Sequence, residues 1–137
     1  KILDATKYYK EYEGKFDKIL LDVPCLGIGV IKRKPDIKWQ RKPEDLQEIC
    51  KIQKIILENC SKYLKTGGEL VYSTCSILEE ENENIIKEFV KKNQNFEIKK
   101  VKNTIKIFEN FIKKEGYISI KPTEKNDGFF ICKLVKK

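Results

Sequence analysis

Residues 16–25 of the chain read FDKILLDVPC, and this stretch decides the fold. The apolar run at positions 19–21 is continuous, Asp22 ends it, and Pro24 prevents its extension. A short apolar run bounded by a proline is typical of a strand that is buried on both faces, as in a parallel sheet. We therefore expect a buried parallel strand whose carboxyl end carries Asp22 and, in the loop just beyond, Cys25.

A helix and a second strand follow this first strand. Pro43 suits the first turn of a helix, and the apolar positions after it recur at intervals of three and four residues. The resulting face consists of Leu46, Ile49, Gln53, Ile56, Leu57, Cys60, Tyr63 and Leu64. The glycines at 67–68 predict the end of the helix, and residues 69–73 (ELVYS) predict a strand that ends at residues 74–76. Strand, helix and strand in this order predict a right-handed parallel crossover.

The remaining elements complete an α/β sheet. The sequence predicts the end of a strand at 1–5, a helix from a capping box at Ser76 and Glu79 to about Lys92, a strand at 96–101, a short helix near 107–113 and a closing strand at 129–135. The prolines at 35 and 43 predict that the segment 31–42 is not helical. We expect an open sheet, mostly parallel with an antiparallel edge, of which this chain holds about half.

The composition fits a single domain that spans residues 1–137. The chain carries a net charge of +8 and 40% hydrophobic residues, which is enough for one core. No apolar run approaches the roughly 18 residues of a membrane helix and no signal peptide opens the chain, so we expect a soluble, cytoplasmic protein. The chain has no methionine and begins at Lys1, so we expect a piece of a longer protein.

Basic residues cluster in the segment 31–42, which reads IKRKPDIKWQRK. This clustering is compatible with contacts to the phosphates of a nucleic acid, and equally with a solvated surface, because lysine is abundant along the whole chain. The same holds for Trp39 within it, which suits either a loop anchor or a platform for base stacking.

The five cysteines are Cys25, Cys50, Cys60, Cys75 and Cys132, and the chain has no histidine. The cysteines lack the short paired spacing of zinc ligands, and an odd number without a signal peptide argues against a disulfide framework, so we expect free thiols and no metal. Cys50, Cys60 and Cys132 lie within a predicted helix or strand, where a cysteine is typically a packing residue. Cys25 and Cys75 follow two strand ends and could face one pocket, with the helix expected after Ser76 lowering the pKa of Cys75.

Two carboxylates also lie at predicted strand ends, Asp4 and Asp22. Ligands of open α/β sheets bind at the carboxyl ends of the strands, so each side chain is either a ligand contact or a simple loop cap. The glycines at 27 and 29 do not form a dinucleotide-binding fingerprint, because the third glycine is absent and a basic loop follows instead of a helix.

Five motifs occur in order along the chain: DVPC with Gly27 (22–27), PDIKW (35–39), LKTGG (64–68), YSTCS (72–76) and DGFF (127–130). Together they resemble the carboxyl-terminal half of the catalytic domain in the Sun/RsmB-type (NSUN-like) RNA cytosine-5 methyltransferases, with most similarity to the bacterial 16S ribosomal RNA branch. The resemblance is weakest at 96–125. It implies a Rossmann-like sheet that uses S-adenosylmethionine and lacks its amino-terminal strands here.

The resemblance also implies a role for each candidate site residue. Cys75 would attack carbon 6 of a cytosine in ribosomal RNA, and Cys25 would help to release the product. Asp4 would help to hold the cofactor, and Asp22 would contact either the cofactor or the edge of the cytosine ring. The RNA would contact Lys32, Arg33, Lys34, Lys38, Trp39 and Arg41, with the target base unstacked.

The chain departs from the family in ways that set further expectations. Val23 and Leu26 stand where the family usually has alanine and serine, which leaves the role of the adjacent thiol intact. The glycine-rich cofactor loop of the family precedes Lys1, so we expect the chain alone to be inactive, to bind cofactor weakly and to self-associate through an exposed sheet edge. Two other readings stay open: an RNA-binding module without catalysis and a degenerate methyltransferase-like scaffold.

Overall fold

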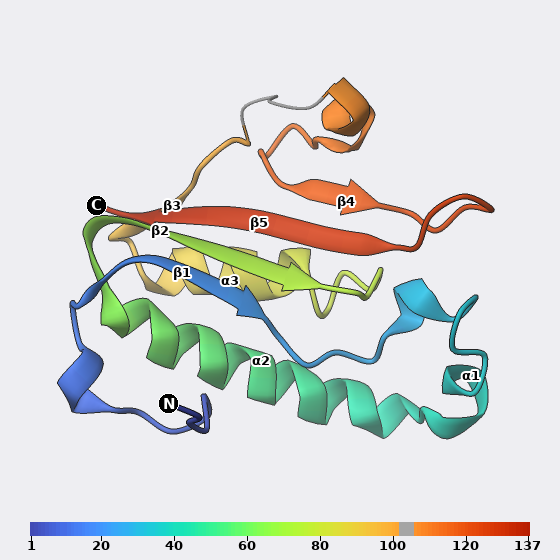
Figure 1. Ribbon diagram of the computed structural model, residues 1–137, viewed down its shortest axis with the longest axis horizontal. Helices are drawn as coiled ribbons and strands as arrows, with labels where there is room; N and C mark the ends of the chain where they lie inside the picture. The colour runs from blue at the N-terminus through green and yellow to red at the C-terminus, as the bar shows by residue number, and fades with distance from the viewer. Residues whose placement is uncertain (102–105) are drawn as a thin grey trace.

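A computed structural model describes residues 1–101 and 106–137 of the chain (Figure 1). Its strands are β1 (Phe16–Asp22), β2 (Leu64–Thr74), β3 (Phe96–Ile98), β4 (Ile118–Ile120) and β5 (Phe129–Lys136). Its α-helices are α1 (Ile37–Gln40), α2 (Pro43–Tyr63) and α3 (Glu83–Lys92), and short 3-10 helices lie at Lys10–Tyr12, Ile28–Val30 and Lys106–Phe111. None of the described helices combines the length and the apolar character needed to cross a membrane.

The strands form one mixed sheet in the order β1-β2-β5-β3, with β4 also paired to β5. β1 and β2 are parallel and are joined by α2, whereas β5 is antiparallel to β2, β3 and β4. The expected α/β class, the crossover and the presence of both parallel and antiparallel strands are confirmed. The antiparallel part extends beyond one edge strand, because β5 pairs on both of its sides.

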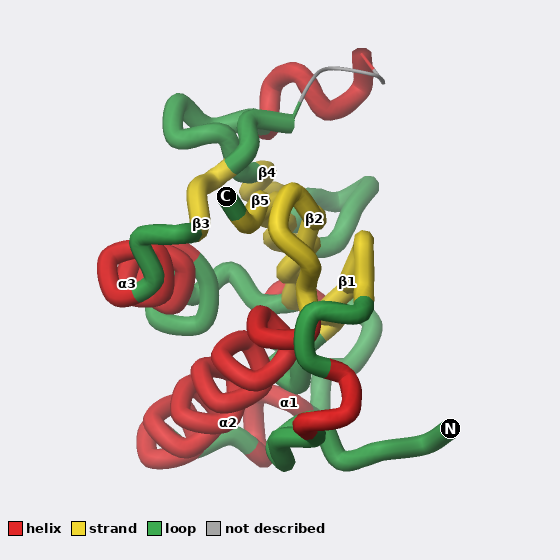
Figure 2. Tube along the Cα trace, turned by 90° about the vertical axis from the view of Figure 1, so that its left-hand side faces the viewer, coloured by secondary structure: helices red, strands yellow, loops and turns green. Residues whose placement is uncertain are grey.

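The core lies between one face of the sheet and the helices. Figure 2 shows α2 and α3 on the same side of the strands. Side chains from β2 and β5 that share this face are fully buried, among them Leu70, Tyr72, Phe130, Cys132 and Leu134. α2 contributes Ile56, Leu57, Cys60 and Tyr63, and α3 contributes Ile85, Ile86 and Phe89. This one-sided core aligns β1 and β2, so that their carboxyl ends meet at the same edge.

The expectation that the first strand is buried on both faces is wrong. Leu20 is 72% exposed in β1, whereas Leu21 beside it is buried. The physical reason is that β1 is an edge strand among the described residues and that the helices cover only the face to which Leu21 points.

Three further expectations about local structure are also wrong. Residues 1–5 contain no strand; instead Asp4 accepts hydrogen bonds from the amide and hydroxyl of Thr6 in a turn. The basic segment contains α1, because proline disturbs the turn that precedes it and Pro35 therefore does not prevent a helical turn that begins at Ile37. The second long helix begins at Glu83, because the Ser76 hydroxyl is bound to Glu81 and does not cap a helix.

The remaining predicted elements are confirmed with shifted ends. α2 ends at Tyr63, and the glycines at 67–68 lie within β2, which is longer than predicted. β3, the short helix at 106–111 and β5 occupy the expected places. The short strand β4 was not expected, because its three residues lie in a stretch without a clear pattern.

Candidate active site

Two thiols meet beyond the carboxyl ends of β1 and β2. Both strands point toward the same edge of the sheet, where the loop after each one begins (Figure 1). Cys25 lies in the first loop and Cys75 in the second, and their Sγ atoms are 3.1 Å apart, so that one thiol donates a hydrogen bond to the other. Both side chains are half-buried. The structure therefore brings together the two cysteines that the sequence singled out.

Burial affects the proton of Cys25 most strongly. It raises the pKa of this thiol from an ordinary value near 9 to about 12, and the hydrogen bond with Cys75 acts in the same direction. Desolvation has this effect because it disfavours the charged thiolate. Cys25 therefore keeps its proton at neutral pH. The helix expected to begin directly after Ser76, beside Cys75, is not in place, because α3 begins at Glu83.

A third loop closes the site through two glycines. The amide of Gly29 donates to the carbonyl of Cys75 at 3.0 Å, and the amide of Gly128 donates to the carbonyl of Gly29 at 2.8 Å. A Cβ atom on Gly29 would lie 2.5 Å from the Gly128 oxygen and 2.6 Å from the Cys75 oxygen. Only glycine fits between these backbones, which ties the DGFF segment to both thiol loops.

A buried carboxylate that sequence reasoning missed connects the two thiol loops. Glu81 is fully buried and accepts hydrogen bonds from the Leu26 amide at 3.0 Å, the Gln53 side chain at 2.9 Å and the Ser76 hydroxyl at 2.5 Å. The sequence carries little signal for it, because Glu81 belongs to the run EEENE at 79–83, which has the composition of a solvated surface.

The two aspartates predicted to hold a cofactor lie far apart. Asp22 ends β1 beside the thiol loops, where its carboxylate accepts a hydrogen bond from the Ser73 hydroxyl at 3.0 Å. Asp4 lies near the other end of α2: the neighbouring Thr6 carbonyl accepts a hydrogen bond from Asn59, close to the end of that helix. The structure thus brings Asp22 to the site and leaves Asp4 away from it.

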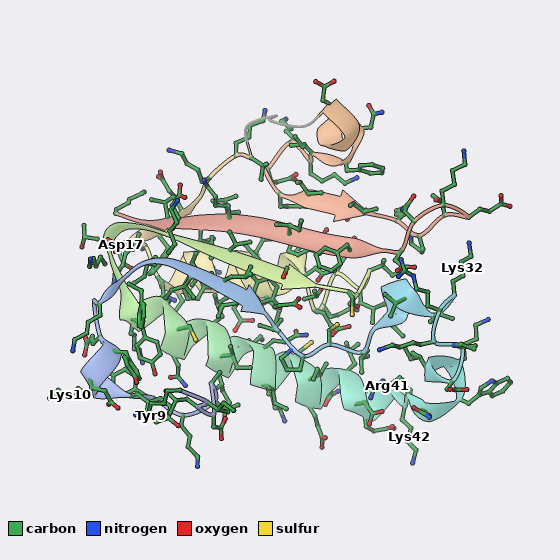
Figure 3. All side chains as sticks on the ribbon, in the orientation of Figure 1. Tyr9, Lys10, Asp17, Lys32, Arg41 and Lys42 are labelled. Atoms are coloured by element: carbon green, nitrogen blue, oxygen red, sulfur yellow. The ribbon has the colours of Figure 1, made fainter. Side chains whose placement is uncertain are left out.

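The basic segment lies at the same end of the molecule as the thiols. Figure 3 shows Lys32 and Arg41 at the end toward which β1 points, and Lys10 and Asp17 at the opposite end. Three of its cations also support the fold: Lys32 binds the Glu124 carbonyl, Arg33 forms an ion pair with Asp127 at 2.8 Å, and Arg41 donates to the Leu26 carbonyl at 3.3 Å. The exposed side chains of Lys34 and Lys38 remain directed to solvent.

Trp39 extends from the surface of this segment. Its side chain is 88% exposed, whereas Ile37 in the same helical turn is buried. Ile37 therefore anchors the loop, and its Cδ1 atom would contact a Cβ atom placed on Gly27 at 3.2 Å. This arrangement removes one of the two interpretations of Trp39, that of a loop anchor.

The other three cysteines and the groove between α2 and α3 lie outside the candidate active site. Cys60 and Cys132 are buried in the core, and the Cys50 thiol donates to the Glu80 carbonyl at 3.4 Å. A hollow of about 210 Å³ between α2 and α3 is bordered by the ion pairs Lys54–Glu88 and Lys92–Glu58. It carries none of the site residues. Among residues 1–101 and 106–137, no group of three or more side chains is arranged to hold a metal ion.

Comparison with known proteins adds to this geometry. The model of the family "16S rRNA methyltransferase RsmB/F" matches residues 1–135. Ribosomal RNA small subunit methyltransferase B of Escherichia coli (strain K12) is 42% identical over 125 residues, which is 91% of this chain and 27% of that protein. The chain thus spans about a quarter of the length of this curated relative.

Solved structures agree with the sequence relatives. The crystal structure of PH0851 superposes with a TM-score of 0.81 at 32% identity, over 90% of this chain and 27% of that one. NSun6 from Pyrococcus horikoshii with SFG superposes with a TM-score of 0.72 at 33% identity, over 88% of this chain and 30% of that one. Family model, sequence relatives and structures concur, and the chain belongs to the 16S rRNA methyltransferase RsmB/F family.

Proposed function

We propose that the protein containing this chain methylates carbon 5 of a cytosine in small-subunit ribosomal RNA through a covalent cysteine adduct, and that residues 1–137 are part of one catalytic domain. The observation that carries the proposal is the 3.1 Å contact between Cys25 and Cys75 at the ends of two parallel strands. Packing does not require two thiols from different loops to meet outside the core. The curated relative is a ribosomal RNA methyltransferase by name. Because its substrate would be ribosomal RNA, the proposed place of action is the cytoplasm.

The covalent step requires one nucleophilic sulfur. The Cys75 thiolate would add to carbon 6 of the cytosine, and the electron pair of the double bond would move to carbon 5. Carbon 5 would then take the methyl group from the sulfonium of the methyl donor, whose sulfur keeps the electron pair of the broken bond and leaves as a thioether. The proton on carbon 5 leaves to a base, the double bond returns, and the Cys75 thiolate is expelled. The family resemblance gives the nucleophilic role to Cys75 of the TCS motif and product release to Cys25, and the two thiols lie close enough to act on one cytosine.

S-adenosylmethionine, the methyl donor of the family, supplies an activated methyl group when bound. Asp22 fits such a ligand chemically, since its carboxylate is exposed at the carboxyl end of β1 and can accept hydrogen bonds from amino or hydroxyl groups. Alternatively, the same carboxylate would contact the edge of the cytosine ring. For Asp4 to join it, residues 1–5 would have to lie along the free edge of β1.

The RNA contacts follow the basic segment. We assign Lys34, Lys38 and Trp39 to direct contact with RNA, because their side chains are exposed at the end of the molecule that carries the thiols. Lys32, Arg33 and Arg41 would contact RNA in addition to the structural bonds that they already make.

The experiment that tests the proposal traps the adduct. The full-length protein is incubated with ribosomal RNA that contains 5-fluorocytosine, whose carbon 5 cannot release fluorine as a cation. A covalent complex is expected for the wild type. It should be lost in Cys75→Ala, whereas Cys25→Ala should accumulate adduct on unmodified RNA. Persistence of the adduct in Cys75→Ala would assign the nucleophile elsewhere.

The exposed Trp39 beside Lys38 also favours a second function, RNA binding without catalysis. This alternative predicts no adduct with any variant. It also predicts an RNA affinity that falls steeply with salt and does not change in Cys25→Ala or Cys75→Ala.

A further inference from the structure

The buried carboxylate of Glu81 has polar partners but no cation partner among the described residues. It is 0% exposed, and its two oxygens accept three hydrogen bonds. Burial of a carboxylate costs free energy unless hydrogen bonds replace those that it makes with water. The three donors therefore stabilise Glu81 in this position and are held in place by it. The identity of the three donors shows which parts of the site Glu81 connects.

Each donor belongs to a different part of the site. The amide of Leu26 follows Cys25 directly, and the hydroxyl of Ser76 follows Cys75 directly. The third donor, Gln53, comes from the middle of α2 and also donates to the carbonyl of Pro24 at 2.9 Å. One carboxylate thus joins both thiol loops to the rigid helix below them.

The position of the carboxylate is itself fixed from the sheet. The hydroxyl of Tyr72 donates to the Glu81 carbonyl at 2.7 Å. Asn82 donates to the Ser76 carbonyl at 3.0 Å and accepts a hydrogen bond from the Thr74 hydroxyl at 2.5 Å. The Gln53 side-chain nitrogen donates to both Pro24 and Glu81, whereas its side-chain oxygen has no hydrogen-bond partner among the described residues.

We propose that Glu81 is a positioning residue that holds the Cys25 loop and the Cys75 loop at the spacing at which their thiols meet. The importance of this spacing for methyl transfer rests on the function proposed above, but the spacing itself does not. A charged acceptor suits the position, because a carboxylate takes all three donors at once. Glutamine would offer one acceptor oxygen to Leu26 and Gln53 and would have to donate to the Ser76 hydroxyl.

The test measures the spacing by crosslinking the two thiols in the full-length protein. Diamide takes up the two thiol hydrogens and leaves a Cys25–Cys75 disulfide, which is followed by the loss of two mass units and by peptide mapping. We expect Glu81→Ala to slow this crosslink by about tenfold or more, because a displacement of the loops by about an ångström changes reaction rates strongly. Glu81→Gln should slow it by about threefold, because the bonds from Leu26 and Gln53 remain and only the bond with Ser76 has to reverse its direction.

The matched control is Glu80→Ala, since Glu80 is exposed beside Glu81 and should leave the crosslinking rate unchanged. A Glu81→Ala protein that unfolds cooperatively and crosslinks at the wild-type rate would overturn the proposal, as would a wild type that forms no crosslink. If Glu81→Ala does not fold, Glu81→Gln decides: a reduced rate supports the proposal, and an unchanged rate contradicts it.

Activity measurements separate this proposal from the proposed function. In Glu81→Ala, the rate of adduct formation with 5-fluorocytosine RNA should fall while the RNA concentration for half-saturation stays the same, because the buried side chain does not reach RNA. A crosslink that depends on Glu81 in a protein that forms no adduct would uphold the positioning role and reject the covalent mechanism. An adduct rate that falls only through weaker RNA binding would reject the positioning role.

Discussion

Gly29 shows how strongly a single residue constrains the site. Its backbone contacts the carbonyl of Cys75 on one side and Gly128 on the other, at distances that leave no room for a side chain. The thiol of Cys25 is constrained differently, by burial that keeps it protonated. Spacing and proton affinity at the site are thus set by individual backbone and side-chain positions.

Gly29→Ala should separate the three loops. We expect a loss of about 1–3 kcal/mol in the free energy of unfolding, because the new methyl group overlaps two carbonyl oxygens. Adduct formation with 5-fluorocytosine RNA should fall as well, and both are measured on the purified variant. The control is Gly14→Ala, which strains a left-handed backbone (φ 62°) far from the thiols. It should reduce the free energy of unfolding by about 1–2 kcal/mol, and adduct formation by the folded protein should stay the same.

The raised pKa of the Cys25 thiol should be measurable from the pH dependence of its alkylation by iodoacetamide. Only the thiolate reacts, so labelling of Cys25 in the folded protein should rise about tenfold for each pH unit and should not level off below about pH 11. The same peptide in urea should level off near the ordinary thiol value. A plateau near pH 9 in the folded protein would contradict the assignment of a buried, protonated Cys25.

At the scale of elements, the patterned segments could be predicted and the irregular ones could not. The apolar run of β1 and the three-and-four spacing of α2 are local signals, and both elements appear in the structure. The exposed face of β1 depends on which elements cover the sheet, and the start of α3 depends on Ser76 bonding to Glu81. Such tertiary contacts override local capping signals.

The site follows the same division. Cys25 and Cys75 could be predicted to meet, because they follow adjacent parallel strands. The role of Glu81 could not, because an acidic run carries no sign that one of its members is buried. Asp4 was placed at a strand end by a pattern too short to distinguish a strand from a turn.

Helix α1 exposes Trp39, which the proposed function assigns to contact with RNA. Trp39→Ala should weaken RNA binding by about 1–3 kcal/mol, because a base that stacks on the indole would lose its platform. The melting temperature should not change. The contrasting variant is Ile37→Ala, which removes the buried anchor of this segment and should lower the melting temperature. RNA-binding titrations and thermal melts of both variants distinguish a loss of RNA contact from a loss of stability. Equal affinity in Trp39→Ala and wild type would remove Trp39 from the interface.

The free edge of β1 should govern association of the 137-residue chain. β1 pairs only with β2 among the described residues, and Leu20 and Phe16 are exposed along it. An unpaired apolar edge invites strand pairing between molecules, so sedimentation should show oligomers that dissociate in Leu20→Lys. The control is Glu88→Lys, which changes the charge of an exposed residue on α3 and should leave the oligomers intact. A monomeric wild-type chain would contradict this prediction.

At the scale of the whole molecule, buried acids make stability depend on alkaline pH. Burial raises the pKa of Cys25 and of Cys132 from near 9 to about 12, and that of Tyr117 from near 10 to about 12. The folded state therefore binds protons more tightly than the unfolded state. Their contribution to stability is complete below about pH 9 and is lost as the pH rises to about 12.

Denaturant melts between pH 7 and 11 check this dependence. The midpoint should hold up to about pH 9 and then decline, with a shallower decline in Cys25→Ser, where one of the shifted groups is absent. A midpoint that rises above pH 9 would contradict the sign of the shifts.

The pairing of Gly29 with Gly128 links the first thiol loop to a segment near the end of the chain. During synthesis the ribosome releases the amino-terminal part first, so Cys25 and Cys75 both emerge before the segment that fastens their loops. The contacts that hold the Cys25 and Cys75 loops against each other are consequently complete only after Gly128 has been synthesised, so the geometry around the two thiols is established late in translation of these residues.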